Sequence, residues 1–155
     1  MSLESVRAFF AANAPDIAVI QSPVSSATVA LAAEAYGVAP ARIAKTLSLR
    51  VGERVVLLVT SGTARMDNRK VKALLGGKPK MLGLDEVAGI TGHEVGGVCP
   101  FGLKTPLPIY CDISLQAFDA VVPAAGSIHS AVRIAPMRMA ELVGAEWVDV
   151  CEQQR

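Results

Sequence analysis

The chain has 155 residues, a hydrophobic content of 52% and a formal net charge of +1, the size and composition of one ordinary domain with a sizeable core. Only 19% of the residues are charged, which excludes a disordered polymer and a polycation that binds nucleic acid through overall charge. There is no apolar run of the roughly 20 residues that span a bilayer, and no basic and apolar leader at the N-terminus. Three cysteines without disulfide-framework spacing favour a reducing compartment. We therefore expect a single cytoplasmic domain, residues 1–155.

Capping and breaking residues predict five helices. Ser2 is a suitable N-cap for a first helix that Pro15 ends, and Asp67 is a suitable N-cap for a third. Gly37 is placed to end the second helix. The expected helices after the first are Thr28–Tyr36, Asn68–Leu75, Asp85–Ile90 and Pro136–Val143, with short helical turns at Pro40 and Leu115–Phe118.

The clearest strand signal is a hairpin from Thr46 to Thr60, which turns at Val51-Gly52-Glu53. Pro106 and Pro108 at the start of another strand predict an edge position for it. Because strands and helices do not alternate strictly, we expect an α+β fold with a mixed, curved sheet. The strands expected besides the hairpin are Ile17–Ile20, Lys80–Leu82, Leu107–Asp112, Ala120–Val122, Ser130–Ile134 and Trp147–Val150.

The glycine loop, residues 96–102 with the sequence GGVCPFG, is the most unusual stretch of the chain. Paired glycines let a ligand approach the main chain closely, and Pro100 stiffens the loop. Backbone N–H groups in such a loop suit a carbonyl or phosphate oxygen. The alternative is a tight turn that joins two strands.

Few other residues suggest chemistry. Lys45 stands at the entrance of the hairpin, where a strand can present an ammonium to a cleft or to solvent. His93 and Cys99 are six residues apart, but no second pair has the spacing of a metal site, so no metal is expected. Cys99 with His93 or His129 stays open as a thiol nucleophile and base. A basic stretch from Arg65 to Lys80 indicates either a phosphate-binding face or a solvated helix face.

Three motifs in order resemble the YbaK/EbsC family of aminoacyl-tRNA deacylases, which is related to the editing domain of bacterial prolyl-tRNA synthetases. They are Lys45-Thr46-Leu47, Met66-Asp67-Asn68-Arg69-Lys70, and the glycine loop followed by Leu107-Pro108. The resemblance implies a partly barrel-like sheet surrounded by helices and a reaction without a cofactor. That reaction is hydrolysis of the ester that joins a mischarged amino acid to the 3′ adenosine of tRNA.

The resemblance also implies residue roles. Lys45 matches the lysine that holds the terminal nucleotide, and Gly96, with Gly97 beside it, matches the glycine whose N–H contacts the scissile carbonyl. Some members carry an aspartate where this chain has Ala131, so it looks unlike the cysteinyl-specific branch. The remaining expected site residues bind the amino acid or nucleotide (Ser26, Thr28, Pro100, Phe101, Gly126, His129) or acceptor-stem phosphates (Arg69, Lys70, Lys72).

The sequence thus supports a deacylase that edits mischarged aminoacyl-tRNA in trans, with an aminoacyl-tRNA synthetase as a further candidate partner. Two alternatives stay open: a non-catalytic module of the same fold that binds tRNA or a synthetase, and a thiol hydrolase that uses Cys99. The sequence identifies neither the amino acid removed nor the oligomeric state.

Overall fold

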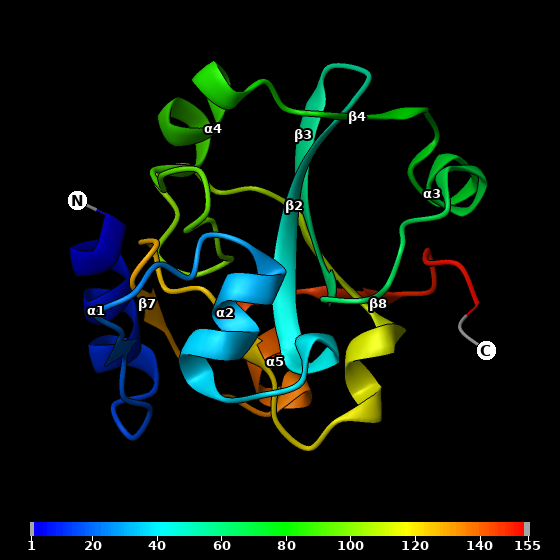
Figure 1. Ribbon diagram of the computed structural model, residues 1–155. Helices are drawn as coiled ribbons and strands as arrows, with labels where there is room; N and C mark the ends of the chain where they lie inside the picture. The colour runs from blue at the N-terminus through cyan, green and yellow to red at the C-terminus, as the bar shows by residue number, and fades with distance from the viewer. Residues whose placement is uncertain (1, 154–155) are drawn as a thin grey trace.

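A mixed β-sheet forms the centre of the computed structural model, which describes residues 2–153 (Figure 1). Its strands β4, β2, β3, β5 and β8 lie in that order, β2 antiparallel to β3 and β4, and β5 parallel to both β3 and β8. The sheet does not close into a barrel. These strands are β2 (Ile43–Val51), β3 (Arg54–Ser61), β4 (Pro79–Met81), β5 (Ile109–Asp112) and β8 (Glu146–Val148). A short strand, β6 (Val122–Pro123), pairs parallel with the start of β2. Two further strands, β1 (Ile20–Gln21) and β7 (Ser130–Ala131), form a separate antiparallel pair.

Five α-helices surround the sheet in the described part of the chain, which confirms the predicted α+β class. The predicted cap Asp67 is confirmed, because it accepts from two N–H groups of the first turn of α3. The predicted cap Ser2 is instead the first residue of α1, and its hydroxyl donates to the Gly126 carbonyl. Thr28, predicted as the first residue of the second helix, is its N-cap and accepts from Leu31 N–H. Gly37 ends α2 with a φ of 66°, a left-handed conformation that glycine adopts without strain. The helices are α1 (Ser2–Asn13), α2 (Val29–Tyr36), α3 (Asn68–Leu75), α4 (Leu84–Thr91) and α5 (Pro136–Val143), with 3-10 turns η1 (Pro40–Arg42) and η2 (Ile113–Ala117).

The predicted edge position of the strand at 107–112 is wrong. β5 begins only at Ile109 and lies between β3 and β8, so it has a hydrogen-bonded neighbour on both sides. Pro106 and Pro108 precede the strand and therefore remove no donor from it, and the carbonyl of Pro108 accepts from Leu57 N–H at 2.9 Å. The prolines mark the start of a central strand.

The two faces of the β2–β3 hairpin pack against different cores. One face joins a large cluster with α1 and the glycine loop, which includes Phe10 and Phe101. The other face joins a smaller cluster with α3 and β8, which includes Leu49 and Val71. Because strand side chains alternate, β2 sends Thr46 and Ser48 to the first face and Lys45 to the second.

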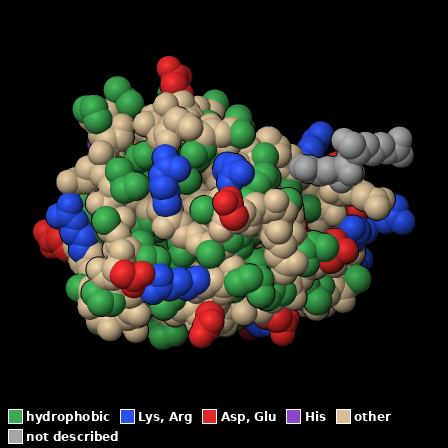
Figure 2. Space-filling model, turned by 90° about the horizontal axis from the view of Figure 1, so that it is seen from below, with side chains coloured by type: hydrophobic (Ala, Val, Ile, Leu, Met, Phe, Trp, Pro, Cys, Tyr) green, Lys and Arg blue, Asp and Glu red, His purple; other side chains and the backbone are tan. Residues whose placement is uncertain are grey.

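The molecular surface carries charges of both signs. On the face in Figure 2, lysine and arginine side chains are interspersed with aspartate and glutamate side chains. Exposed ion pairs join Arg138 to Asp16 at 2.6 Å and Arg42 to Asp119 at 2.8 Å. No helix among residues 2–153 is both long enough and apolar enough to cross a membrane.

Candidate active site

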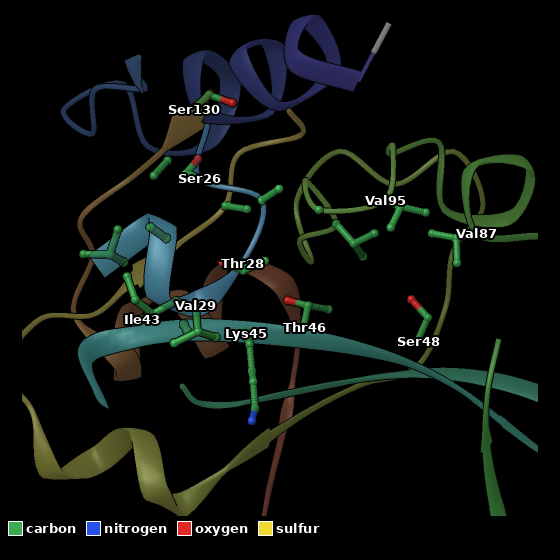
Figure 3. Close-up of a pocket in the computed structure, with 18 of the residues that line it drawn as sticks. Ser26, Thr28, Val29, Ile43, Lys45, Thr46, Ser48, Val87, Val95 and Ser130 are labelled. Carbon is green, nitrogen blue, oxygen red and sulfur yellow. The ribbon is translucent and has the colours of Figure 1, made fainter. Parts of the chain in front are cut away.

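A cavity of about 250 Å³ lies between α2, the first half of β2, α4 and the glycine loop (Figure 3). Three segments far apart in the sequence supply its walls: the 26–36 region, the 43–48 segment of β2, and the 81–98 region with β4 and α4. Short segments around Val122 and Ser130 complete the lining. The packing of α2 and the glycine loop over β2 therefore creates the cavity.

The cavity is closed at one end and open at the other. At the α2 end its lining residues Ala32, Tyr36, Ile43, Val122 and Ala131 are all buried. At the α4 end three of the lining residues are exposed, Met81 by 58%, Leu84 by 75% and Val95 by 49%, beside the buried Leu82 and Val87. The closed end suits a small uncharged group, and the open end lets a larger molecule continue into solvent.

Two hydroxyl side chains of β2, Thr46 and Ser48, point into the cavity (Figure 3). The hydroxyl oxygen of Thr46 is buried and has no hydrogen-bond partner among the described residues. Lys45 is the one charged residue among the described residues that line the cavity. The cavity therefore offers hydrogen bonds from hydroxyl and backbone groups, and its lining, within the part of the chain that the structure describes, has neither a carboxylate nor an imidazole.

In the glycine loop, Gly96 and Gly97 play different parts. Gly96 lines the cavity, and its N–H has no hydrogen-bond partner among residues 2–153. Gly97 donates its N–H to the Glu94 carbonyl at 2.9 Å, and its own carbonyl accepts from Gly126 N–H at 3.0 Å. A free N–H on the cavity wall can contact a carbonyl oxygen, and Gly96 offers one.

Close approaches explain why both positions are glycine. At Gly96, where φ is 91°, a Cβ would lie 3.0 Å from the side chains of Ala27 and Ile128. At Gly97 a Cβ would lie 2.7–2.8 Å from backbone atoms of Ser127, which cannot move aside as a side chain would. The two glycines let the loop pack directly against the 126–128 turn and so fix the cavity wall.

Lys45 lies with Gly96 in the cavity lining, but its ammonium faces the other side of β2 (Figure 3). Nζ donates to the carbonyl oxygens of Ala64, at 2.7 Å, and Gly62, at 3.3 Å. The half-buried position lowers the pKa of Lys45 because burial disfavours the charged form; nearby Cys151 opposes this shift, and nearby Arg65 adds to it. In this conformation Lys45 holds the loop after β3 and does not reach into the cavity.

The other expected pocket residues divide into two groups. Ser26 and Thr28 line the cavity, where Ser26 donates its hydroxyl to the Ile128 carbonyl at 2.9 Å. The remaining four lie outside the lining of this cavity: Pro100 and Phe101 are buried in the core, Gly126 packs on the backbone of Ser2 in α1, and His129 is exposed in a turn.

The expected tRNA-binding residues lie on α3, which stands at the opposite end of β4 from α4 and the open end of the cavity (Figure 1). The ammonium of Lys70 is occupied by Asp149 at 3.3 Å and the Cys151 carbonyl at 3.0 Å. Arg69 and Lys72 are exposed and have no ion-pair partner within residues 2–153. Arg69 and Lys72 are therefore available to phosphates.

Cys99 and His93 do meet, but in the core. Cys99 Sγ lies 3.6 Å from His93 Nε2, which is 2.7 Å from the Phe101 carbonyl oxygen, and both side chains are fully buried. Burial raises the pKa of the Cys99 thiol to about 12 and lowers the pKa of His93, so both are neutral at neutral pH. A protonated thiol without solvent access is not a nucleophile.

Most of the cavity lining was not among the predicted site residues; the unpredicted part includes Thr46, Ser48, Met81, Leu84, Val87 and Val95. A signal existed for Thr46 and Ser48, because both alternate with Lys45 along a predicted strand. The apolar residues of β4 and α4 carried no such signal, since they resemble ordinary core positions.

The fold and the cavity define an α+β domain with a small, largely apolar pocket walled by a glycine loop. Residues 24–142 match the family model described as "Aminoacyl-tRNA editing domain". The chain belongs to this aminoacyl-tRNA editing family, the YbaK/EbsC family, which confirms the resemblance drawn from its motifs.

Similar proteins agree with this assignment. The chain is 46% identical to "Uncharacterized protein YwhH" of Bacillus subtilis over 98% of both chains. It is 29% identical to "Putative Cys-tRNA(Pro)/Cys-tRNA(Cys) deacylase EbsC" of Enterococcus faecalis over 79% of this chain and 76% of that one. A solved structure described as "a putative trans-editing enzyme for prolyl tRNA synthetase" superimposes with a TM-score of 0.90 and 31% identity, over 98% of both chains.

Proposed function

We propose that this protein is a deacylase that acts in trans and hydrolyses the ester bond of mischarged aminoacyl-tRNA. The observation that carries the proposal is the free N–H of Gly96 on the wall of a pocket that is closed at one end. Such an N–H can stabilise the oxyanion that develops on the scissile carbonyl, and the closed end can hold the amino-acid side chain.

Among residues 2–153, the cavity lining has no carboxylate or imidazole to serve as general base. In our proposal, water is therefore activated by the substrate itself, through the ribose hydroxyl next to the ester. Lys45 holds the terminal nucleotide, for which its side chain must turn from the Gly62 and Ala64 carbonyls toward the open end of the cavity. Arg69 and Lys72 contact acceptor-stem phosphates.

Single-turnover deacylation of a panel of mischarged tRNAs tests this proposal. We expect hydrolysis of a subset of the panel and a rate about a hundredfold lower for Lys45→Ala, because a misplaced substrate loses much of its reactivity. Arg54→Ala is the matched control: Arg54 also donates to a backbone carbonyl, that of Leu75 at 2.8 Å, but lies outside the cavity lining. Full activity of Lys45→Ala would remove Lys45 from the mechanism.

A second candidate is a module that binds tRNA without hydrolysing it. The orientation of the Lys45 ammonium, away from the cavity, favours this function. It predicts tRNA binding that weakens with added salt and no turnover on any member of the panel.

A further inference from the structure

Glu94 precedes the glycine loop and joins the turn that carries the free N–H to a second turn far away in the sequence. Its carbonyl oxygen accepts from Gly97 N–H at 2.9 Å, and its carboxylate oxygen Oε1 accepts from Ile128 N–H at 2.9 Å. We propose that Glu94 is a positioning residue, which fixes the direction of the Gly96 N–H and so sets the rate of ester hydrolysis. The inference rests on the deacylase function proposed above.

The turn over residues 94–97 does not hold the Gly96 N–H in one direction by itself. Gly96 is the third residue of this turn, and its φ of 91° is the left-handed conformation that a type II turn requires there. The Gly96 N–H belongs to the peptide between Val95 and Gly96, which points in opposite directions in type I and type II turns. Because glycine adopts both conformations without strain, contacts outside the turn must select one of them.

The 126–128 turn supplies those contacts through Ile128. The Ile128 side chain lies so close that a Cβ on Gly96 would be 3.0 Å from it. The Ile128 carbonyl accepts from the N–H of Ser26 at 2.6 Å and from its hydroxyl at 2.9 Å. By holding the Ile128 N–H, the Glu94 carboxylate therefore ties the Gly96 turn to the segment that carries Ser26 on the cavity wall.

A second tie between the two turns lies on the other side of Gly96, where Gly126 N–H donates to the Gly97 carbonyl at 3.0 Å. The two ties flank Gly96, so together they hold both ends of the peptide whose direction matters. Of these two ties, the one from Glu94 to Ile128 uses a side chain, and a substitution can remove it without a change in the backbone.

Glu94 is exposed and lies outside the cavity lining, so its effect on the reaction passes through Ile128 and Gly96. Glu94→Ala removes the tie, whereas Glu94→Gln keeps an acceptor oxygen at the same position. Glu86→Ala is the matched control for charge, because Glu86 is also an exposed glutamate close in sequence, but its carboxylate pairs with Arg50.

The direction of the Gly96 N–H can be measured without catalysis, by ¹H–¹⁵N residual dipolar couplings of the full chain. We expect the Gly96 coupling to depart from its wild-type value in Glu94→Ala and to keep that value in Glu94→Gln and Glu86→Ala. An unchanged Gly96 coupling in Glu94→Ala would overturn the inference whatever the activity of the variant.

Kinetics test the consequence, with the mischarged tRNA that the wild-type protein hydrolyses fastest. For Glu94→Ala we expect kcat to fall about tenfold and KM to stay within about twofold, because a misdirected N–H weakens a contact made in the transition state. Glu94→Gln should restore kcat to within about threefold of the wild type, and Glu86→Ala should leave it unchanged. A merely structural role predicts a lower melting temperature with an unchanged kcat.

The outcomes separate this inference from the deacylase function. If the wild-type protein is active and Glu94→Ala is equally fast, the positioning role is wrong and the deacylase function stands. Equal losses in Glu94→Ala and Glu94→Gln would also overturn the positioning role, because the charge and not the hydrogen bond would then matter. If the wild-type protein hydrolyses no member of the panel, the deacylase function is wrong, and the effect of Glu94 on hydrolysis is refuted with it.

Discussion

Thr46→Val is expected to stabilise the unliganded protein and to impair its activity. The buried hydroxyl of Thr46 has no hydrogen-bond partner among the described residues, and an unsatisfied buried polar group costs about 1–3 kcal/mol. Valine keeps the β-branched shape that suits a strand. We therefore expect the free energy of unfolding to rise by about 1 kcal/mol, which raises the melting temperature by roughly 2–4 °C in a domain of this size.

The matched control is Thr60→Val on the neighbouring strand β3. Thr60 is fully buried and pairs with Lys45 across the hairpin, but its hydroxyl donates to the Ser61 carbonyl at 3.0 Å. Losing that satisfied hydrogen bond should cost about 1 kcal/mol, so the two threonine variants should change stability in opposite directions.

Urea denaturation and thermal unfolding of both variants test the sign, and deacylation tests the role. If the Thr46 hydroxyl is kept free for the substrate, kcat/KM should fall by about tenfold in Thr46→Val while stability rises. A destabilised Thr46→Val, similar to Thr60→Val, would refute the argument, because the hydroxyl would then have a partner in the free protein.

Three further predictions concern the glycine loop and the core below it. Gly97→Ala should lower the melting temperature markedly, because the added Cβ would lie 2.7–2.8 Å from backbone atoms. Gly89→Ala is the control: its Cβ would have no atom within 4 Å, so the melting temperature should stay unchanged or rise. Equal effects of the two substitutions would contradict the packing at Gly97. Burial lowers the folded-state pKa of His93 below 6.5, so at acidic pH the unfolded state binds more protons than the folded state. The free energy of unfolding should therefore fall as the pH drops below about 6.5. His93→Gln should flatten this pH dependence of stability, measured by urea titrations from about pH 7.5 to 5. Cys99→Ala should leave single-turnover deacylation unchanged within about twofold, and loss of activity in a folded Cys99→Ala would support the thiol mechanism instead.

Much of the local structure could be predicted from the sequence because it depends on neighbouring residues. The N-cap Asp67, the helix end at Gly37 and the hairpin turn at Gly52 all follow from side-chain and backbone preferences within a few positions. The motifs that indicate the family are likewise short and linear.

The site could be predicted only in part. Ser26, Thr28, Lys45 and Gly96 do line one cavity, as expected for residues of one site. Pro100 and Phe101 belong to the core instead, because the aromatic ring of Phe101 packs 4.7 Å from that of Phe10 on α1. Contacts between a loop and a helix that are 91 positions apart in the chain, as Phe10 and Phe101 are, leave no periodic signal in the sequence.

By itself, the sequence determined the helices, the hairpin, the family and the glycine loop, because each rests on local conformational preferences or on linear motifs. Only the tertiary structure decided which face of β2 lines the cavity, and therefore that Thr46 and Ser48 point into it while the Lys45 ammonium turns to the carbonyls of Gly62 and Ala64. The physical reason is the two-residue period of a strand: it places neighbours on opposite faces, but the packing of α1, α2 and α3 chooses what each face meets.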